Sequence, residues 1–423
     1  MNERYANSMF IVFIVSWVVR LIYSNKNFNP NAVGDPDRYF RSFKFYLEHD
    51  FYTVVSQGSS LLYNVVISFF YSITHNVSLS FFCTNFISVL LVVGLGVAIL
   101  FKINKKIQSK YIYVIVAIYA FNVLELNAYQ KASNDMFQAV FLLAIFYVFF
   151  IFKEKTIPYK YFIIGVFAAL CTLIRPTSLI LIVLIFVSIF VKGLISNNNY
   201  KYIARCYLLF LAPLIFLMLI FHYPAIKENN KLGFYSKNFN KNLNWTQRNY
   251  LGIKRMQSGE IPIHKNSIFR KTTFAYVRNY LNENGSESLP KNQIEFLKKD
   301  PLLYFQMVVY NVTYASAKYF RYYAFLLVIP ILCLFKQPIL IKSKLPIYMF
   351  FVVILIISLV CFTLIEYRWF TGYGILLSLG LLYGLHFFKT SNLEKIFRSV
   401  VYSSLLIISV FNFLLTFFIK SSY

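Results

Sequence analysis

Acidic residues are scarce in this chain. Asp and Glu together number 16 of 423 residues, against 42 Lys and Arg, and charged residues make up only 14% of the chain. A typical soluble domain carries about 25% charged residues. Hydrophobic residues make up 58% and aromatic residues 20%, and long apolar runs recur along the sequence. This composition argues against an ordinary soluble protein and predicts an all-α polytopic membrane protein.

Cysteine and histidine are also few, and neither follows a metal-binding pattern. The cysteines fall in or beside apolar runs without CxxC or Cys/His spacing, at positions 83, 171, 206, 333 and 361. We expect small buried hydrophobes here, rather than a disulfide framework or a zinc site. His49, His222 and His264 lie far apart in the sequence, which favours ordinary surface or interface histidines.

Common catalytic motifs are absent too. The chain has no Gly-rich phosphate loop, no GxSxG and no HExxH, so nucleotide-driven chemistry and the common hydrolase mechanisms lack support. The formal net charge of +26 does not indicate nucleic acid as a partner, because the basic residues cluster in short segments between apolar runs. Membrane lipids with anionic headgroups are the expected counterions.

The apolar runs predict the membrane crossings. A helix needs about 20 residues to cross about 30 Å of hydrocarbon, and on that basis we expect about 11 to 13 transmembrane helices. The runs cover residues 9–23, 79–101, 111–126, 136–152, 161–174, 178–191, 207–221, 322–334, 348–365, 370–387 and 400–418. No small-residue cleavage site follows the first run, so we expect a retained anchor rather than a signal peptide.

The shorter run 61–73 is ambiguous. About 13 residues form a helix near 20 Å long, which is short for a crossing. We predict a juxtamembrane or re-entrant helix, because a complete crossing would reverse the orientation of every later segment. Two short crossings within residues 61–101 would preserve the same orientation.

Basic loops predict which side of the membrane each segment faces, because short basic loops stay in the cytoplasm. These loops lie at residues 102–110, 153–160, 192–205, 336–344 and 389–398. The segments that alternate with them are 26–60, 127–135, 175–176, 222–303 and 366–368. The unusual polar residues of the chain therefore share the outer face.

This topology divides the chain into three regions. Residues 1–221 form an N-terminal transmembrane region that contains the first outer loop, 26–60, with its juxtamembrane helices. Residues 222–303 form a larger extracytoplasmic loop, and residues 304–423 form a C-terminal transmembrane region. The large loop shows little helical periodicity and is too long for an ordinary connection. It is either a binding element or cap, or a partly ordered surface segment.

The first outer loop carries the acids that stand out most, in the sequence Gly-Asp-Pro-Asp-Arg-Tyr-Phe at residues 34–40. An unpaired carboxylate beside a membrane span is costly, so its presence suggests chemistry. Asp35 is the better candidate for a general base. Asp37 has an equally good interpretation as the N-terminal cap of a helix that runs through Phe40 and Leu47. Tyr39 lies within the same loop.

Three further places combine acids with bases at the outer face. Asp135 follows Lys131 and is interpreted as a helix cap, a site residue or both. Arg175 precedes a proline, and its guanidinium either binds phosphate or snorkels to lipid headgroups. Glu366 and Arg368 are flanked by aromatic residues that are typical of an interface belt, and they pair with each other or with a ligand headgroup.

The order of these elements resembles the GT-C glycosyltransferases, and in particular the bacterial relatives of protein mannosyltransferases and of the lipid A aminoarabinose transferase. Four short segments carry the resemblance: 34–39 after the first span, 133–135 before a span, 173–177 after a helix rich in small residues, and 296–304 leading back to the membrane. Members of the family commonly have an Asp-Glu pair followed by Tyr in the first outer loop. Here Pro36 stands in place of that Glu, which leaves Asp35 as the match.

The resemblance implies transfer of a sugar from a polyprenyl-phosphate donor to the hydroxyl of a lipid, glycan or protein acceptor, with inversion. Asp35 would be the general base. The protein would lie in the inner membrane of a bacterium, with its site facing the periplasm or exterior. The implied substrate-binding residues are Asp37, Tyr39, Lys131, Asp135, Arg175, Glu366 and Arg368. Of these, Lys131, Arg175 and Arg368 would stabilise the departing phosphate. The resemblance specifies no cofactor, although some relatives use a divalent cation, which Asp135 and Glu366 would hold.

Two other classes of protein fit the same composition. A lipid-linked sugar flippase or an O-antigen polymerase-like protein is also polytopic and basic with a large outer loop, and would not need Asp35. A transporter, however, more often places its polar or broken segments near the middle of the membrane. A channel-like or scaffold protein is the third alternative, and the acids at the outer face disfavour it.

Overall fold

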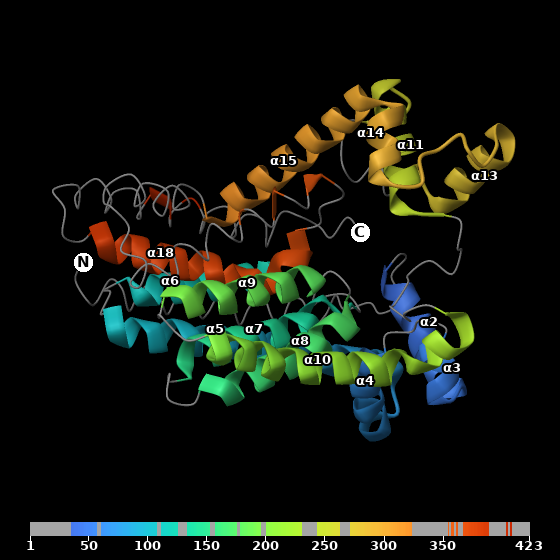
Figure 1. The fold of residues 1–423 in the computed structure, drawn as a ribbon. Coiled ribbons are helices and arrows are strands. Elements are labelled where there is room, and N and C mark those ends of the chain that lie inside the picture. Colours follow the sequence, from blue (N-terminus) through green and yellow to red (C-terminus); the bar gives the residue numbers. More distant parts are fainter. Residues whose placement is uncertain are drawn as a thin grey trace. The chain divides into compact units, whose positions relative to one another are not determined.

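The computed structural model describes residues 35–56, 61–107, 111–125, 133–152, 157–175, 178–195, 200–230, 243–262, 271–323 and 367–388, and the single positions 354, 357, 358, 361, 362, 403, 404 and 407. These residues form helices and turns, with no strand among them, which confirms the all-helical prediction (Figure 1). Two of the described helices, at Val77–Lys105 and Tyr200–Glu228, are long and apolar enough to cross a membrane.

The chain divides into two compact units. Unit 1 comprises residues 1–235, 322–351 and 368–423, and unit 2 comprises residues 236–321 and 352–367. The sequence places the start of the outer segment at residue 222, whereas the helix that begins at Tyr200 continues to Asn229. Asn230 ends it in the left-handed conformation, with φ 51°. Asn accepts this conformation more readily than most residues and is a common helix terminator.

Unit 1 contains most of the apolar helices. It begins with α2 (Asp35–Glu48), α3 (Phe51–Ser56), α4 (Leu61–Thr74) and α5 (Val77–Ile107). It continues with α6 (Ile112–Glu125), α7 (Asp135–Ile151), α8 (Ile157–Ile174), α9 (Leu179–Ile195) and α10 (Tyr200–Asn229). The 3-10 helix η6 (Tyr367–Tyr373) leads into α18 (Gly374–Phe388). Each helix from α5 to α10 coincides with a predicted apolar run, because a run of that length can bury or shield its own backbone only as a helix.

The helices of unit 1 pack side by side as a row. Helix α7 lies between α5 and α8, α10 packs along the other side of α8, and α9 contacts α10. On the far side, α6 packs against α5, and α18 contacts both of them. Figure 1 shows these helices running in similar directions, with the shorter α4 set across them. Helix α4 has 14 residues, so it is about 21 Å long and shorter than the hydrocarbon core.

Helices α8 and α10 approach closely at Gly165. A methyl group there would collide with the backbone carbonyl oxygen of Phe210 and with the ring of Pro213. We expect Gly165→Ala to lower the free energy of unfolding by about 1–3 kcal/mol, because a backbone oxygen inside a helix cannot move aside. Gly94→Ala is the matched control, since nothing lies within 4 Å of its added methyl group. Thermal unfolding in one detergent should show a lower midpoint for Gly165→Ala alone, and equal midpoints would contradict this packing.

The described part of unit 2 is helical, although residues 222–303 show little helical periodicity in the sequence. It contains α11 (Trp245–Gln257), α13 (Phe274–Asn284), α14 (Gln293–Lys299) and most of α15 (Pro301–Tyr323). Its core is formed by buried apolar side chains from all four helices, among them Tyr250, Val277, Phe296 and Leu303. These helices are short and mixed in polarity, so periodicity alone does not reveal them.

Polar caps begin three of these helices, and the sequence does contain that signal. Asn244 and Gln247 form a capping box at α11, in which each side chain accepts a hydrogen bond from the other residue's backbone N–H at 3.0 Å. Thr273 caps α13 and Asn292 caps α14. In the last turn of α11, Arg255 donates a hydrogen bond of 2.9 Å to Glu260, and this bond holds the pKa of the exposed Glu260 carboxyl below its usual range.

Candidate functional site

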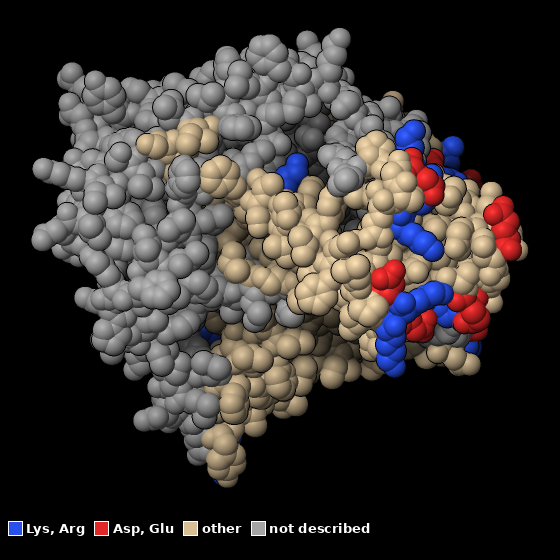
Figure 2. Space-filling model, turned by 90° about the horizontal axis from the view of Figure 1, so that it is seen from above, with Lys and Arg blue, Asp and Glu red and all other residues tan. Residues whose placement is uncertain are grey.

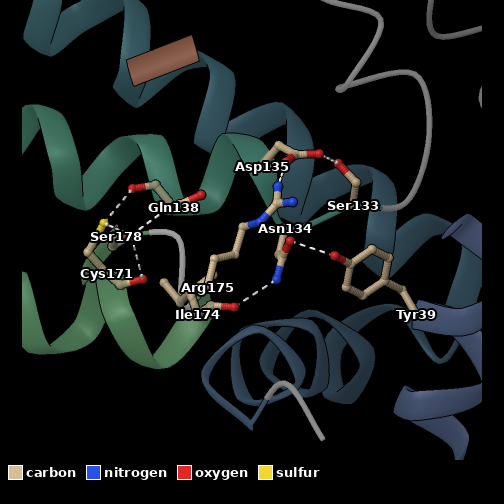
Figure 3. A network of polar contacts seen from close by, with 9 residues as sticks. All are labelled: Tyr39, Ser133, Asn134, Asp135, Gln138, Cys171, Ile174, Arg175 and Ser178. Atoms are coloured by element: carbon tan, nitrogen blue, oxygen red, sulfur yellow. Dashed lines mark hydrogen bonds and ion pairs between the residues drawn. The ribbon is translucent and has the colours of Figure 1, made fainter. Parts of the chain in front are cut away.

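Tyr39 connects α2 to the rest of unit 1. Its side chain is only 1% exposed, and its ring packs edge-on against the ring of Tyr63 in α4, with the ring centres 5.6 Å apart. The hydroxyl of Tyr39 donates a hydrogen bond of 2.6 Å to the side-chain oxygen of Asn134. This bond joins residues 95 positions apart and attaches α2 to the beginning of α7 (Figure 3).

Asn134 lies at the N-terminus of α7 and is fully buried. Its side chain makes no capping hydrogen bond to the backbone of α7. Instead, its Nδ2 donates a hydrogen bond of 3.0 Å to the carbonyl oxygen of Ile174, the last residue of α8. Asn134 therefore bridges α2 and the end of α8, and a capping role does not describe what its side chain does.

Asp135 and Arg175 form an ion pair beside this bridge (Figure 3). Their side chains are 2% and 8% exposed. The hydroxyl of Ser133 also donates a hydrogen bond of 2.9 Å to the Asp135 carboxylate. The pair brings the start of α7 to the turn between α8 and α9, where Pro176 disfavours a helical conformation for Arg175 and so helps to end α8. Two buried charges are tolerated only when they pair and are hydrogen-bonded.

A second polar link lies one turn further along α7. The side chain of Gln138 donates a hydrogen bond to the hydroxyl of Ser178, which in turn donates one of 3.2 Å to the carbonyl oxygen of Cys171 (Figure 3). These three residues were not among the site residues predicted from the sequence. A glutamine inside an apolar run was the available signal, because a polar side chain in such a run needs a partner.

The structure brings together three of the predicted site residues, namely Tyr39, Asp135 and Arg175. Asp35 is the first residue of α2, one helical turn before Tyr39. Asp37 does not join this network, because it pairs with Arg41 at an exposed position of the same helix. Three other residues considered in the sequence fall outside the described residues, namely Lys131, His264 and Glu366. Arg368 is described only through the backbone of η6.

The network does not provide a set of metal ligands. Among the described residues, no three His, Cys, Asp or Glu side chains lie close enough together to hold a metal ion. The carboxylate of Asp135 is paired with a guanidinium, which would compete with a divalent cation for the same oxygens. The residues present therefore do not fit a divalent cation at Asp135.

Comparison of the chain with models of known protein families, with characterised proteins and with solved structures finds no match. The described part of the chain defines an all-helical protein with two candidate membrane-spanning helices. Its principal polar site is the buried network of Tyr39, Asn134, Asp135 and Arg175.

Proposed function

We propose, first, that the chain is a polytopic membrane protein. The support comes from apolar helices that are only partly buried by other parts of the chain. Only 22% of the most apolar stretch of α10 is buried, and only 39% of the most apolar stretch of α5. In α10, Leu208 and Phe216 are 68% and 63% exposed, and in α9 Val183 is 61% exposed. A soluble protein buries its most apolar helices in its core, whereas a bilayer is the medium in which such faces are stable.

We propose, second, that the protein is a glycosyltransferase that uses a polyprenyl-phosphate sugar as donor and a hydroxyl group as acceptor. The observation that carries this proposal is the joining of Tyr39, Asp135 and Arg175, three residues expected at one outer-face site, by a buried polar network. Asp35 begins the helix that this network attaches. Polar groups buried among apolar helices are expensive, and in membrane proteins they commonly mark functional sites.

In the proposed reaction, the Asp35 carboxylate takes the proton of the acceptor hydroxyl as the oxygen attacks the anomeric carbon of the sugar. The bond between the anomeric carbon and the phosphate oxygen breaks, and the polyprenyl phosphate leaves with the bonding electrons. Attack from the face opposite the leaving group inverts the anomeric configuration. The Tyr39 hydrogen bond to Asn134 holds α2, and therefore Asp35, at a constant position relative to the α8–α9 turn.

The departing phosphate requires positive charge nearby. Arg175 is held at the α8–α9 turn by Asp135, and a guanidinium held in place in this way is preorganised for a phosphate oxygen. The Asp135 carboxylate balances the charge of Arg175, so the ion pair by itself is neutral. We therefore assign the net positive charge at the donor phosphate to Lys131 and Arg368, and the positioning of the phosphate to Arg175.

A direct assay tests the proposed reaction. The purified protein is incubated with a panel of polyprenyl-phosphate sugars and candidate acceptors, and the free lipid phosphate is measured together with the glycosylated product. We expect equal amounts of both from one donor in the panel. Movement of an intact lipid-linked sugar across reconstituted vesicles, with no release of lipid phosphate, would instead identify a flippase and overturn the proposal.

A further inference from the structure

Helix α15 packs one face into unit 2. Leu303, Met307 and Ala315 lie along this face and are 1%, 2% and 5% exposed. Asn311 lies on the same face and donates a hydrogen bond of 2.9 Å to the carbonyl oxygen of Cys361. These residues recur every four positions, which is the spacing of a single helical face. Leu303 and Met307 are thus part of the core of unit 2.

The outward face of α15 is also apolar. Leu302, Phe305, Val309 and Val312 are 69%, 66%, 60% and 46% exposed, and their spacings of three, four and three residues align them as one stripe. The other exposed positions on this side, 306, 313 and 316, carry no charge. The outward face of a helix in water normally carries charged side chains. We call the four apolar residues the α15 stripe.

Most of the exposed large apolar residues in the described part of unit 2 lie in this region, and Phe362 is also exposed. The exposed apolar surface extends onto α14, where Ile294 and Leu297 are 68% and 42% exposed. The large apolar residues that are exposed in the described part of unit 2 include none from α11 or α13. Figure 2 shows charged side chains of both signs gathered over α11, α13 and α14, and a surface with few charges beside them. Water is therefore the natural medium for α11 and α13, but not for the stripe.

The composition of α15 indicates which medium covers the stripe. Its 23 residues include six Tyr and two Phe and no acidic residue. Aromatic residues with Lys or Arg and few acids are typical of helices that lie at the boundary between lipid headgroups and acyl chains. The apolar run 322–334, an expected membrane crossing, also begins where α15 ends. In the sequence, the expected crossing therefore follows α15 without a polar linker.

We infer that unit 2 rests on the membrane through the α15 stripe, whose side chains enter the boundary between headgroups and acyl chains. The partner is the lipid bilayer surface itself. This inference depends on the membrane part of the proposed function, but not on sugar transfer. In this arrangement, the four exposed apolar side chains of the α15 stripe leave water together. Their insertion also limits the movement of unit 2 away from the membrane surface.

Three single variants of the full-length protein test the inference, and each adds one tryptophan to the same parent. Phe305→Trp places the tryptophan in the α15 stripe, and Leu208→Trp places it on the exposed face of α10. Asn279→Trp places it at an exposed position of α13. Each variant is reconstituted into phosphatidylcholine vesicles with and without brominated acyl chains, and the emission of the parent is subtracted. We expect brominated lipid to reduce the fluorescence of the introduced tryptophan about twofold or more at positions 305 and 208. The fluorescence of the tryptophan at position 279 should not change. Iodide in the water should quench 279 more than 305.

The possible outcomes separate this inference from the membrane proposal. Quenching by brominated lipid at 208 without quenching at 305 would overturn the inference and leave the membrane proposal intact. Absence of lipid quenching at both positions would overturn both. Shielding of 305 from brominated lipid and from iodide alike would show that protein, such as a second copy of the chain, covers the stripe, and would also overturn the inference.

Discussion

Asp35→Asn should reduce sugar transfer by about 10²- to 10⁴-fold, the usual contribution of a general base. Asparagine has nearly the same shape as aspartate but cannot accept the proton of the acceptor hydroxyl. We therefore expect the purified variant to fold and to bind the donor lipid as the parent does. Release of free lipid phosphate, followed over time at saturating donor and acceptor, measures the effect.

Two other acids of α2 serve as controls for this variant. Glu48→Gln alters an exposed carboxylate at the far end of the same helix, and we expect unchanged transfer. Asp37→Asn removes an exposed ion pair with Arg41, and an exposed pair of this kind contributes at most about 1 kcal/mol to stability. If Asp35→Asn retains the parental rate, or if Asp37→Asn loses as much activity as Asp35→Asn, the assignment of Asp35 as the base is wrong.

Asp135→Ala should lower the free energy of unfolding by about 3–5 kcal/mol, because it leaves the Arg175 guanidinium buried without its carboxylate. Arg175→Leu should have an effect of similar size, because it leaves a buried carboxylate. The double variant Asp135→Leu/Arg175→Leu should lose much less stability than the sum of the two single changes, since it removes both charges. The folded fraction that remains after graded heating in detergent gives the comparison.

The same double variant separates a structural role of the ion pair from a role in the reaction. If Arg175 positions the donor phosphate, the double variant should fold and yet transfer sugar far more slowly than the parent at limiting donor. If the double variant folds and transfers sugar at the parental rate, the ion pair only joins α7 to the α8–α9 turn. Arg175 would then not be part of the proposed site.

The sequence predicted the described apolar helices of unit 1, from α5 to α10, well. The run 136–152 corresponds to α7 at Asp135–Ile151, and the run 161–174 falls within α8 at Ile157–Ile174. The reason is physical, because a long apolar run has one economical backbone arrangement and Pro or Asn near its end specifies where the helix stops. Unit 2 escaped prediction because its helices are short and depend on caps and on a shared core rather than on periodicity.

By itself, the sequence determined the helical class and the approximate ends of the apolar helices, along with the scarcity of acids that made Asp35 and Asp135 stand out. Only the tertiary structure decided which of the polar residues meet. Tyr39 and Asn134 are 95 residues apart, and Asn134 and Ile174 are 40 apart. Helix formation depends on neighbouring residues, whereas these contacts depend on how α2, α7 and α8 pack together, which no local pattern in the sequence encodes.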